Sequence, residues 1–379
     1  MENEILITDL AYGGEGVGRT DGKVCFVENA LPGETVIMKV TQDKKKILKG
    51  KAVKWATVSP SRITPPCPYI GSCGGCQYQH VTYIEELKWK EKQVRDYLTR
   101  NLGIEENMIS PITSSSEPYG YRSSVTMHKS WENLSGYFSR DNKTIIPIRE
   151  CMLLHPGLQM TFQTLWQPHQ DSRTFRLSSE GKVLENSTDN FFEVKAGCQK
   201  IITHTRCFFQ NNLEITGKIG NQLKSWVEDF SPETFIDLYC GVGTFTFLSA
   251  GETAKLMLAE ENPWALQALK KNLEARGKTA EILEGQVERK FSGWIAKQAA
   301  SKTFLFIDPP RQGMEGNLAL SLAKKSSLSQ MAYLSCHLGS LARDLKILIE
   351  KGGFKVKQVI PFDMFPRTKH IEMLTLLAR

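Results

Sequence analysis

A cysteine at the end of a short apolar run is the first residue whose position suggests chemistry. The run Tyr333–Ser335 leads into Cys336, and a helical pattern begins at Leu338. Ligands of open α/β sheets bind beyond the carboxyl ends of the strands, and a thiol just before a helix feels the positive end of that helix. This position favours a thiolate, so Cys336 is a candidate nucleophile. A buried cysteine that serves as a small hydrophobic side chain is the alternative.

Three further cysteines lie close together early in the chain. Cys67, Cys73 and Cys76 form a C-x5-C-x2-C pattern with glycines between them, which is typical of metal ligation. A fourth thiolate is needed for an all-cysteine site, and Cys151 is preferred because it follows an irregular stretch. The other downstream candidates are Cys198 and Cys207. Spacing alone does not separate zinc from a [4Fe–4S] cluster, and unligated thiols remain the alternative.

A glycine-containing loop after an apolar run indicates a nucleotide site. Gly241 and Gly243 follow Tyr239, so a ligand can approach the backbone at a helix N-terminus. Glu260, at the end of the next run, is placed to accept hydrogen bonds from ribose hydroxyls. A dinucleotide fingerprint requires a third glycine where Thr246 stands, so S-adenosylmethionine is favoured over NAD. A plain strand-to-helix turn is the alternative.

A carboxylate precedes two prolines in the segment Asp308-Pro309-Pro310-Arg311. The proline rings hold this backbone extended at the ligand edge of the sheet, and such rigidity suits a site that holds a planar base. Asp308 as a helix N-cap is the alternative.

Strand and helix patterns alternate in the last third of the chain, as in a doubly wound α/β sheet. The expected helices are 213–230, 263–276 and 338–350. The expected strands are 234–239, 254–259, 280–283, 303–307, 331–335, 355–360 and 372–377. Five parallel strands and a closing pair without an intervening helix are the methyltransferase variant of this architecture.

The first two thirds of the chain have other patterns. Residues 1–60 form short alternating runs between glycine-rich turns, followed by lysines near Trp55, which suits a nucleic-acid-binding β-barrel or a solvated hairpin. Apolar residues at helical spacing predict one amphipathic helix over 83–102. Short strands expected at 119–122, 131–138 and 191–194 indicate a β-rich middle domain.

Composition narrows the class of protein. A chain of 379 residues favours two or three domains, and its net charge of +7 allows a polyanionic partner. Nine cysteines are an odd and sparse count, which argues for reduced thiols rather than a disulfide framework. No apolar run approaches the length of a membrane span, and the N-terminus lacks a signal-peptide layout. A cytoplasmic location with no membrane partner is expected.

As a set, these motifs resemble the RNA uracil-5-methyltransferase family over nearly the whole chain. The resemblance also includes Phe209-Gln210, Leu341–Asp344 and His370–Glu372. It implies a class I methyltransferase fold, an N-terminal TRAM or OB-like barrel and a small iron–sulfur-binding middle domain. The implied domains are 1–60, 61–205 and 206–379, with helix 83–102 packed on the catalytic domain.

The resemblance also implies a mechanism. Cys336 would add to uracil C6, and Glu372 would be the base that removes the C5 proton. Contacts to S-adenosyl-L-methionine are expected from Gln210, Tyr239, Gly241, Glu260 and Asp308. The ligands of a [4Fe–4S] cluster are expected to be Cys67, Cys73, Cys76 and Cys151. The target uridine must be flipped or single-stranded to reach the thiol.

The expected substrate is 23S rRNA, because ribosomal-RNA members of the family tend to carry the TRAM domain and the tRNA member lacks it. A tRNA methyltransferase of the same mechanism, or a catalytically silent RNA-binding or assembly protein, is the alternative. A monomer is expected. The chain departs from the family after the nucleophile, where His337-Leu338-Gly339-Ser340 replaces Asn-Pro-Ala-Thr, and its methyltransferase domain is short before Asp308.

Overall fold

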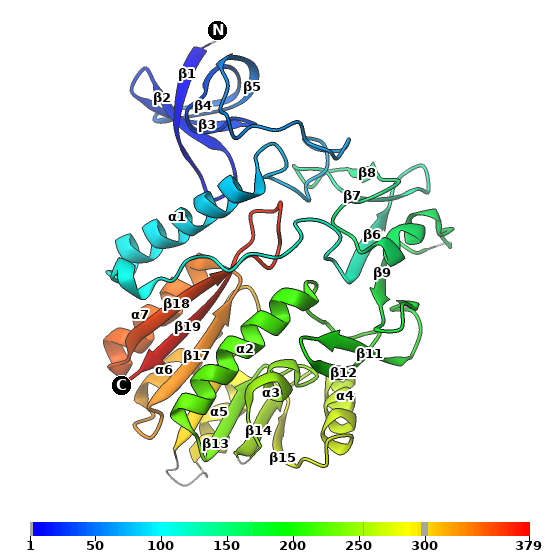
Figure 1. Ribbon diagram of the computed structural model, residues 1–379, viewed down its shortest axis with the longest axis vertical. Coiled ribbons are helices and arrows are strands. Elements are labelled where there is room, and N and C mark those ends of the chain that lie inside the picture. The colour runs from blue at the N-terminus through cyan, green and yellow to red at the C-terminus, as the bar shows by residue number, and fades with distance from the viewer. Residues whose placement is uncertain (1–2, 168, 253, 297–301) are drawn as a thin grey trace.

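The computed structural model describes residues 3–167, 169–252, 254–296 and 302–379. Figure 1 shows a small barrel at the N-terminal end, a long helix beneath it, a β-rich middle region and a large α/β unit that contains the C-terminus. This arrangement of barrel, middle region and α/β sheet confirms the fold class expected from the sequence.

Five strands close the N-terminal barrel in the order β1-β2-β3-β5-β4. The strands are β1 (Asn3–Leu10), β2 (Gly16–Thr20), β3 (Lys23–Glu28), β4 (Thr35–Lys44) and β5 (Ile47–Thr57). Alternate residues such as Ile5, Ile7 and Val36 point inward and form a separate core. Gly18 is required for the barrel to close, because a Cβ there would lie 2.5 Å from the carbonyl oxygen of Leu6.

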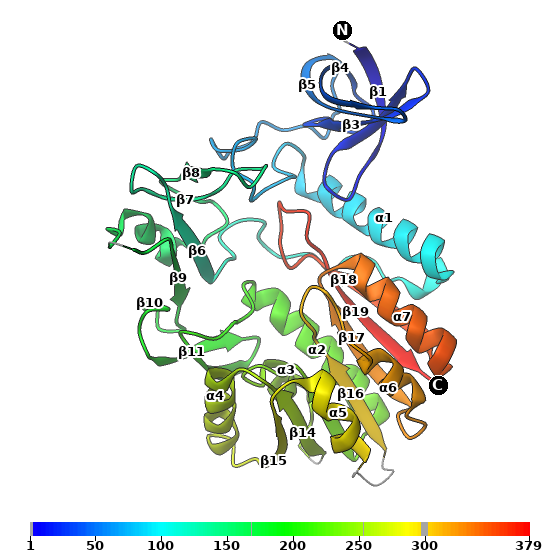
Figure 2. The ribbon, with the colours of Figure 1, turned by 180° about the vertical axis from the view of Figure 1, so that it is seen from behind.

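One long helix, α1 (Tyr83–Leu102), connects the barrel to the α/β unit, and its bounds match the predicted ones. Its buried residues Val94 and Leu98 join the core that contains Leu341 of helix α7 (Leu338–Gly352). Figure 2 shows α1 and α7 side by side. The helix therefore packs on the catalytic sheet unit.

The middle region contains a five-stranded sheet with the order β10-β9-β6-β7-β8. Its strands are β6 (Ser124–Lys129), β7 (Ser135–Phe138), β8 (Ile145–Pro147), β9 (Ser172–Leu177) and β10 (Val183–Glu185). Two short 3-10 helices, η1 (Glu106–Met108) and η2 (Pro156–Gln163), lie before and beside it.

Two strand predictions in this region differ from the structure. The strand predicted at 119–122 is absent from these described residues, and the one predicted at 131–138 begins only at Ser135. Residues 119–122 are irregular because Gly120 turns the chain with φ of 67°. Residues 131–134 form a turn before β7, with Asn133 at φ of 61°. A hairpin of β11 (Phe191–Ala196) and β12 (Gln199–His204) follows the sheet and packs on the catalytic core rather than extending the middle sheet.

Seven strands form the catalytic sheet in the order β15-β14-β13-β16-β17-β19-β18. Five are parallel and are followed by a closing pair without an intervening helix, as the sequence predicts, and β19 is antiparallel to both neighbours. The strands are β13 (Thr234–Leu238), β14 (Lys255–Glu260), β15 (Ala280–Glu284), β16 (Thr303–Ile307), β17 (Gln330–Ser335), β18 (Lys355–Phe362) and β19 (Glu372–Ala378).

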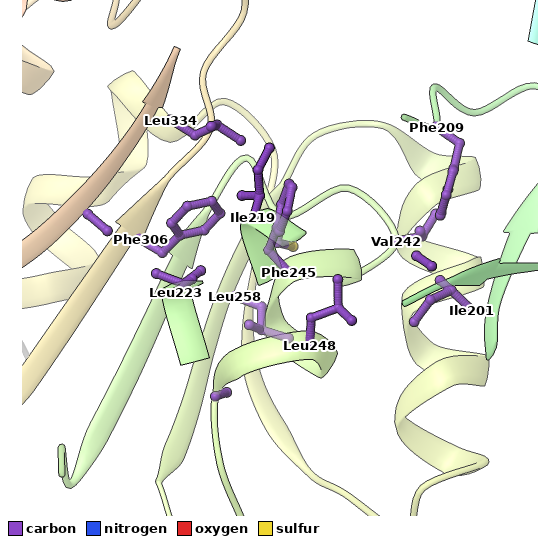
Figure 3. Close-up of a cluster of buried hydrophobic side chains, with 14 of the residues drawn as sticks. Ile201, Phe209, Ile219, Leu223, Val242, Phe245, Leu248, Leu258, Phe306 and Leu334 are labelled. Carbon is purple, nitrogen blue, oxygen red and sulfur yellow. The ribbon is translucent and has the colours of Figure 1, made fainter. Parts of the chain in front are cut away.

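Helices cover both faces of this sheet. The other helices are α2 (Leu213–Phe230), α3 (Thr244–Ser249), α4 (Pro263–Glu274), α5 (Val287–Ala296) and α6 (Leu318–Lys324). Helices α2, α3 and α4 share one apolar core, and α1, α5, α6 and α7 share the other. Figure 3 shows the first core, where Phe245 of α3 packs edge-on against Phe306 of β16 with ring centroids 5.3 Å apart. Burial on both faces explains the continuous apolar runs of the strands.

Candidate active site

Cys336 lies immediately beyond β17, at the carboxyl edge of the parallel strands. In the antiparallel pairing of β17 with β19, Ser335 is opposite Met373. The next residues in that direction are Cys336 and Glu372, so the register brings the thiol and the carboxyl group to the same edge. Glu372 is buried at 7% exposure. The structure thus brings the two predicted catalytic residues together.

The unusual segment after the nucleophile forms a helix cap. Nδ1 of His337 accepts a hydrogen bond from the backbone N–H of Ser340 at 3.2 Å, so His337 is the N-cap of α7. The ring lies over Gly339, where an added Cβ would be 3.0 Å from the imidazole Cε1. Cys336 therefore keeps its place at the start of a capped helix despite the departure from Asn-Pro-Ala-Thr.

The proline-containing loop is fastened to the first turn of α7. Oγ of Ser340 donates to the carbonyl oxygen of Arg311 at 3.0 Å, and Arg343 donates to that of Gln312 at 2.8 Å. The backbone N–H of Met314 donates to Asp344 at 2.8 Å. These bonds hold the loop that begins at Asp308 beside the turn that contains the nucleophile.

Asp308 also contacts the residue expected from the Phe209-Gln210 motif. Nε2 of Gln210 lies 3.4 Å from Oδ2 of Asp308. Gln210 comes from the loop that precedes α2, whereas Asp308 follows β16, so two distant segments meet at this point. The contact places Gln210 at the same sheet edge as Cys336.

Burial raises the pKa of the thiol and of both carboxyl groups at this site. Burial, with smaller contributions from the nearby Glu372 and Asp308 and against an opposing one from Arg311, raises the pKa of the Cys336 thiol to about 12. Burial also raises the pKa of Asp308 to about 7, and burial and then Asp308 raise that of Glu372 well above its ordinary value. The expectation that the helix N-terminus makes Cys336 a thiolate is wrong for the unliganded site, because desolvation outweighs the helix end.

The glycine loop has the geometry expected of a nucleotide site. The backbone N–H of Gly241 donates to Oε2 of Glu260 at 2.9 Å, and that of Asn262 donates to Oε1 at 2.7 Å. Gly241 has φ of 55° and open space where a Cβ would stand, whereas a Cβ on Gly243 would lie 2.4 Å from Phe247. The loop therefore needs glycine at both positions, and it leaves room for a ligand beside Gly241.

Two side chains next to this loop donate hydrogen bonds to carboxyl groups of the protein. Thr246, at the position of the third glycine of a dinucleotide site, donates to Asp237 at 2.5 Å. Burial raises the pKa of Asp237 to about 8. Tyr239 has φ of 64°, a strained conformation for a residue with a side chain, and its hydroxyl donates to Glu288 of α5. Tyr239 thus lies at the expected strand end, with its hydroxyl directed at α5.

A buried ionic network positions the chain just before Glu372. Lys90 of α1 forms ion pairs with Glu86 and with Asp363, each at 2.7 Å. Arg367 has φ of 67°, and its side chain and backbone N–H both bind Glu86. The connection between β18 and β19 is therefore clamped against α1. Sequence patterns did not reveal this network, because its members are far apart in the chain.

The four predicted cluster cysteines line one cavity of about 420 Å³. They are Cys67, Cys73, Cys76 and Cys151, and all are free thiols. The alternatives for the fourth position lie elsewhere, since Cys198 is exposed on the β11–β12 turn and Cys207 is buried in the catalytic core. The backbone N–H of Gly75 donates to Sγ of Cys73 at 3.4 Å.

The four thiols are near one another without forming a compact single-ion site. Across the described ranges, no three His, Cys, Asp or Glu side chains form a group that could hold one metal ion. The cavity also contains Arg122, whose charge acts on Cys76 and Cys151. Nε of Arg122 is buried and has no hydrogen-bond partner in the part of the chain that the structure describes. An anionic group in the cavity would compensate this guanidinium.

A second cavity, of about 670 Å³, connects the barrel, the cysteine segment and the catalytic loops. Lys51, Arg311 and Lys369 line it and have no ion-pair partner among the described residues. Arg62 and Arg140 also line it but are paired with Glu34 and Glu28. Unpaired cations in this cavity, which include the Arg311 that acts electrostatically on Cys336, suit a phosphate backbone.

Comparisons with known proteins agree with this geometry. The fold and the sheet edge define a class I methyltransferase, and a family model for the TRAM domain matches residues 2–53. A second family model, tRNA (Uracil-5-)-methyltransferase, matches residues 188–379. The chain belongs to this family and is an RNA (uracil-5-)-methyltransferase that uses S-adenosyl-L-methionine. Within the described residues, no helix is both long enough and apolar enough to cross a membrane.

Relatives match over almost the full length. An uncharacterized RNA methyltransferase of Bacillus cereus is 28% identical and covers 99% of this chain and 96% of the relative. One from Aquifex aeolicus is 28% identical over 99% and 98% of the two chains. The crystal structure of Pyrococcus abyssi tRNA (uracil-54, C5)-methyltransferase with S-adenosyl-L-homocysteine covers 99% of both chains with a TM-score of 0.75 at 22% identity. This last match shows the same fold.

Proposed function

We propose that this enzyme methylates C5 of a uridine in RNA through a covalent bond between Cys336 and uracil C6. The observation that carries the proposal is the pairing of β17 with β19, which places Cys336 next to Glu372 beside the Asp308 loop. Uracil C5 is a weak nucleophile, so a thiolate must first add at C6 to form an enolate.

The steps use groups at this one sheet edge. The Cys336 thiolate adds to C6, and the electron pair of the C5–C6 double bond moves toward the C4 carbonyl oxygen. S-adenosyl-L-methionine, when bound, would supply an electrophilic methyl group. C5 takes up this methyl group as its bond to sulfur breaks, which leaves S-adenosyl-L-homocysteine. Glu372 then accepts the C5 proton, the C5–C6 double bond re-forms, and the thiolate leaves C6. Because burial raises the pKa values of Cys336 and Glu372 in the free site, the mechanism requires that bound RNA and cofactor lower both pKa values.

Five residues are proposed to hold the cofactor: Gln210, Tyr239, Gly241, Glu260 and Asp308. The open space beside Gly241 and the backbone-anchored Glu260 carboxylate support binding of an adenosine ribose. Asp308, with Gln210 in contact, offers a carboxylate to a cationic group close to the thiol. A positive charge there would lower the pKa of Asp308 and favour its ionised form.

A [4Fe–4S] cluster is proposed for the cavity lined by Cys67, Cys73, Cys76 and Cys151. Each thiolate of such a cluster binds a different iron, so the sulfur atoms stand farther apart than around a single ion. That spacing is compatible with four thiols around a shared cavity that lacks a compact ion site. The cluster with four thiolates is anionic, and the Arg122 guanidinium in the cavity would balance part of its charge.

The RNA substrate is proposed to lie along the cationic cavity that leads to Arg311. The barrel was expected to favour 23S rRNA over tRNA. A tRNA (uracil-54, C5)-methyltransferase shares the fold over 99% of this chain, so the barrel supports RNA binding without favouring either class. We therefore propose either 23S rRNA or tRNA as the substrate. We also propose a cytoplasmic location for the enzyme.

The test is nucleoside analysis by mass spectrometry of rRNA and tRNA from cells with and without the gene. The proposal expects loss of 5-methyluridine at a defined site and its restoration by purified enzyme with S-adenosyl-L-methionine. Restoration by a Cys336→Ala variant would contradict the covalent mechanism. Unchanged RNA in the absence of the gene would favour the alternative of a silent RNA-binding protein.

A further inference from the structure

The loop between β1 and β2 extends from the barrel toward the catalytic residues. Gln93 of α1 holds it, since Nε2 donates to the carbonyl oxygens of Leu10 and Ala11 at 3.2 and 3.1 Å. The loop closes on itself through the N–H of Gly14, which donates to Ala11 at 2.8 Å. Tyr12 therefore projects from a loop that is fixed at both ends.

The Tyr12 side chain packs on the core beneath the active site. That core contains Leu338, the first residue of α7, and Ile371, which precedes Glu372. Tyr12 and Leu338 also line one cavity of about 310 Å³ between the barrel, α1 and α7. Tyr12 therefore shares a cavity with Leu338, two residues after Cys336, although it comes from a different domain.

The Tyr12 hydroxyl is buried and has no hydrogen-bond partner among the residues described. Buried hydroxyl groups are nearly always paired, so an orphaned one next to an active site indicates a missing ligand. The titratable groups close enough to act on it electrostatically are Arg311, Cys336, Glu372 and Lys90. Burial raises the pKa of Tyr12, which keeps the phenol a neutral O–H donor.

These neighbours identify the ligand as the target base. Cys336 and Glu372 are the groups proposed to act on C6 and C5 of the uracil, whereas the proposed ribose ligand Glu260 lies by Gly241. A uracil between the thiol and the carboxyl group presents carbonyl oxygens, and one of them gains negative charge when the thiolate adds. A neutral donor aimed at that oxygen stabilises the enolate.

We propose that Tyr12 of the barrel completes the active site by donating a hydrogen bond from its hydroxyl to a carbonyl oxygen of the flipped uracil. This inference rests on the proposed function. It gives the barrel a role at the reacting base in addition to RNA binding, and it makes Tyr12 a catalytic residue supplied by another domain.

The test compares Tyr12→Phe with the matched control Tyr97→Phe, whose ring lines the same cavity. The phenylalanine at position 12 keeps the packing and removes only the donor. The expected result is a kcat lowered about 10- to 100-fold, with the KM for RNA and the melting temperature unchanged. The control is expected to keep the wild-type kcat.

A second readout separates this proposal from the proposed function. RNA that contains 5-fluorouridine traps the methylated adduct, because C5 then carries fluorine instead of the hydrogen that a base must remove before the thiolate can leave C6. We expect wild type and Tyr12→Phe to form the same final amount of adduct, with the variant slower. Equal rates and equal kcat for the two proteins would overturn the role of Tyr12 while leaving the covalent mechanism in place. Wild-type enzyme that forms no adduct would overturn both.

Discussion

Ser335 of β17 and Met373 of β19 are direct cross-strand partners. The arrangement of the active site depends on this pair, because the residues beyond it are Cys336 and Glu372. A shift of register by one residue would turn every β19 side chain to the other face of the sheet. Two strands that are distant in sequence therefore define where the nucleophile and the base meet.

The cap of α7 is expected to contribute measurably to stability. Replacing His337 by alanine removes the acceptor for the N–H of Ser340 and should lower the free energy of unfolding by about 1 kcal/mol. His337→Asn, which offers a cap oxygen, should recover most of the loss. Urea denaturation of the three proteins checks this, and equal midpoints for wild type and the alanine variant would contradict the capping role.

Loss of Lys90 from its buried ionic network is expected to lower the free energy of unfolding far more than loss of a surface ion pair. Lys90→Met leaves the Glu86 and Asp363 carboxylates buried without their cation and should cost about 3–5 kcal/mol of unfolding free energy. The control is Lys270→Met, which breaks an exposed pair with Glu284 and should cost under about 1 kcal/mol. Urea denaturation measures both variants. Similar losses of unfolding free energy in Lys90→Met and Lys270→Met would show that the buried network does not hold the chain before Glu372 in place.

Cofactor binding is expected to release a proton near neutral pH. The pKa of Asp308 is raised to about 7 in the free site, and a cationic sulfonium favours its ionised form. Affinity for S-adenosyl-L-methionine should therefore fall as the pH drops below 7, by up to about tenfold per pH unit, and level off above it.

Calorimetry in two buffers of different ionisation enthalpy measures the number of protons released when the cofactor binds. S-adenosyl-L-homocysteine, whose sulfur is neutral, should show a weaker pH dependence. The variant Asp308→Asn should lose the dependence on pH, and its persistence there would assign the proton to another group such as Asp237.

The cysteine cavity is expected to hold iron. Purification without oxygen should give on the order of four iron atoms per chain and a brown colour. Cys151→Ser should lower the iron content strongly, whereas the exposed Cys198→Ser should not. A colourless protein with stoichiometric zinc would contradict the cluster.

Local patterns predicted much of the catalytic unit. Continuous apolar runs identify the parallel strands because helices bury both faces, and the predicted bounds of 213–230 and 303–307 match α2 and β16. The middle sheet was harder to predict, because its strands are short and Gly120 and Asn133 place turns where strands were expected. The order of the seven strands was not predicted and comes from the structure.

The features missed by sequence reasoning all depend on long-range contacts. Burial reverses the expected ionisation of Cys336, and burial is not visible in the motif around it. No sequence pattern marked Tyr12 as an active-site residue, because its loop comes near the catalytic residues only when the barrel packs on α1. His337 is an uncommon N-cap residue, so its role emerged only from its bond to Ser340.

The most direct test of the account is to map the covalent adduct between the enzyme and RNA that contains 5-fluorouridine. Proteolysis and mass spectrometry should find the nucleotide on Cys336, and Cys336→Ala should form no adduct and lose methyl transfer by at least about 1,000-fold while it still binds S-adenosyl-L-methionine. The control Cys198→Ala should behave as wild type. An adduct on another residue, or methylation that persists in Cys336→Ala, would contradict the central role of this thiol.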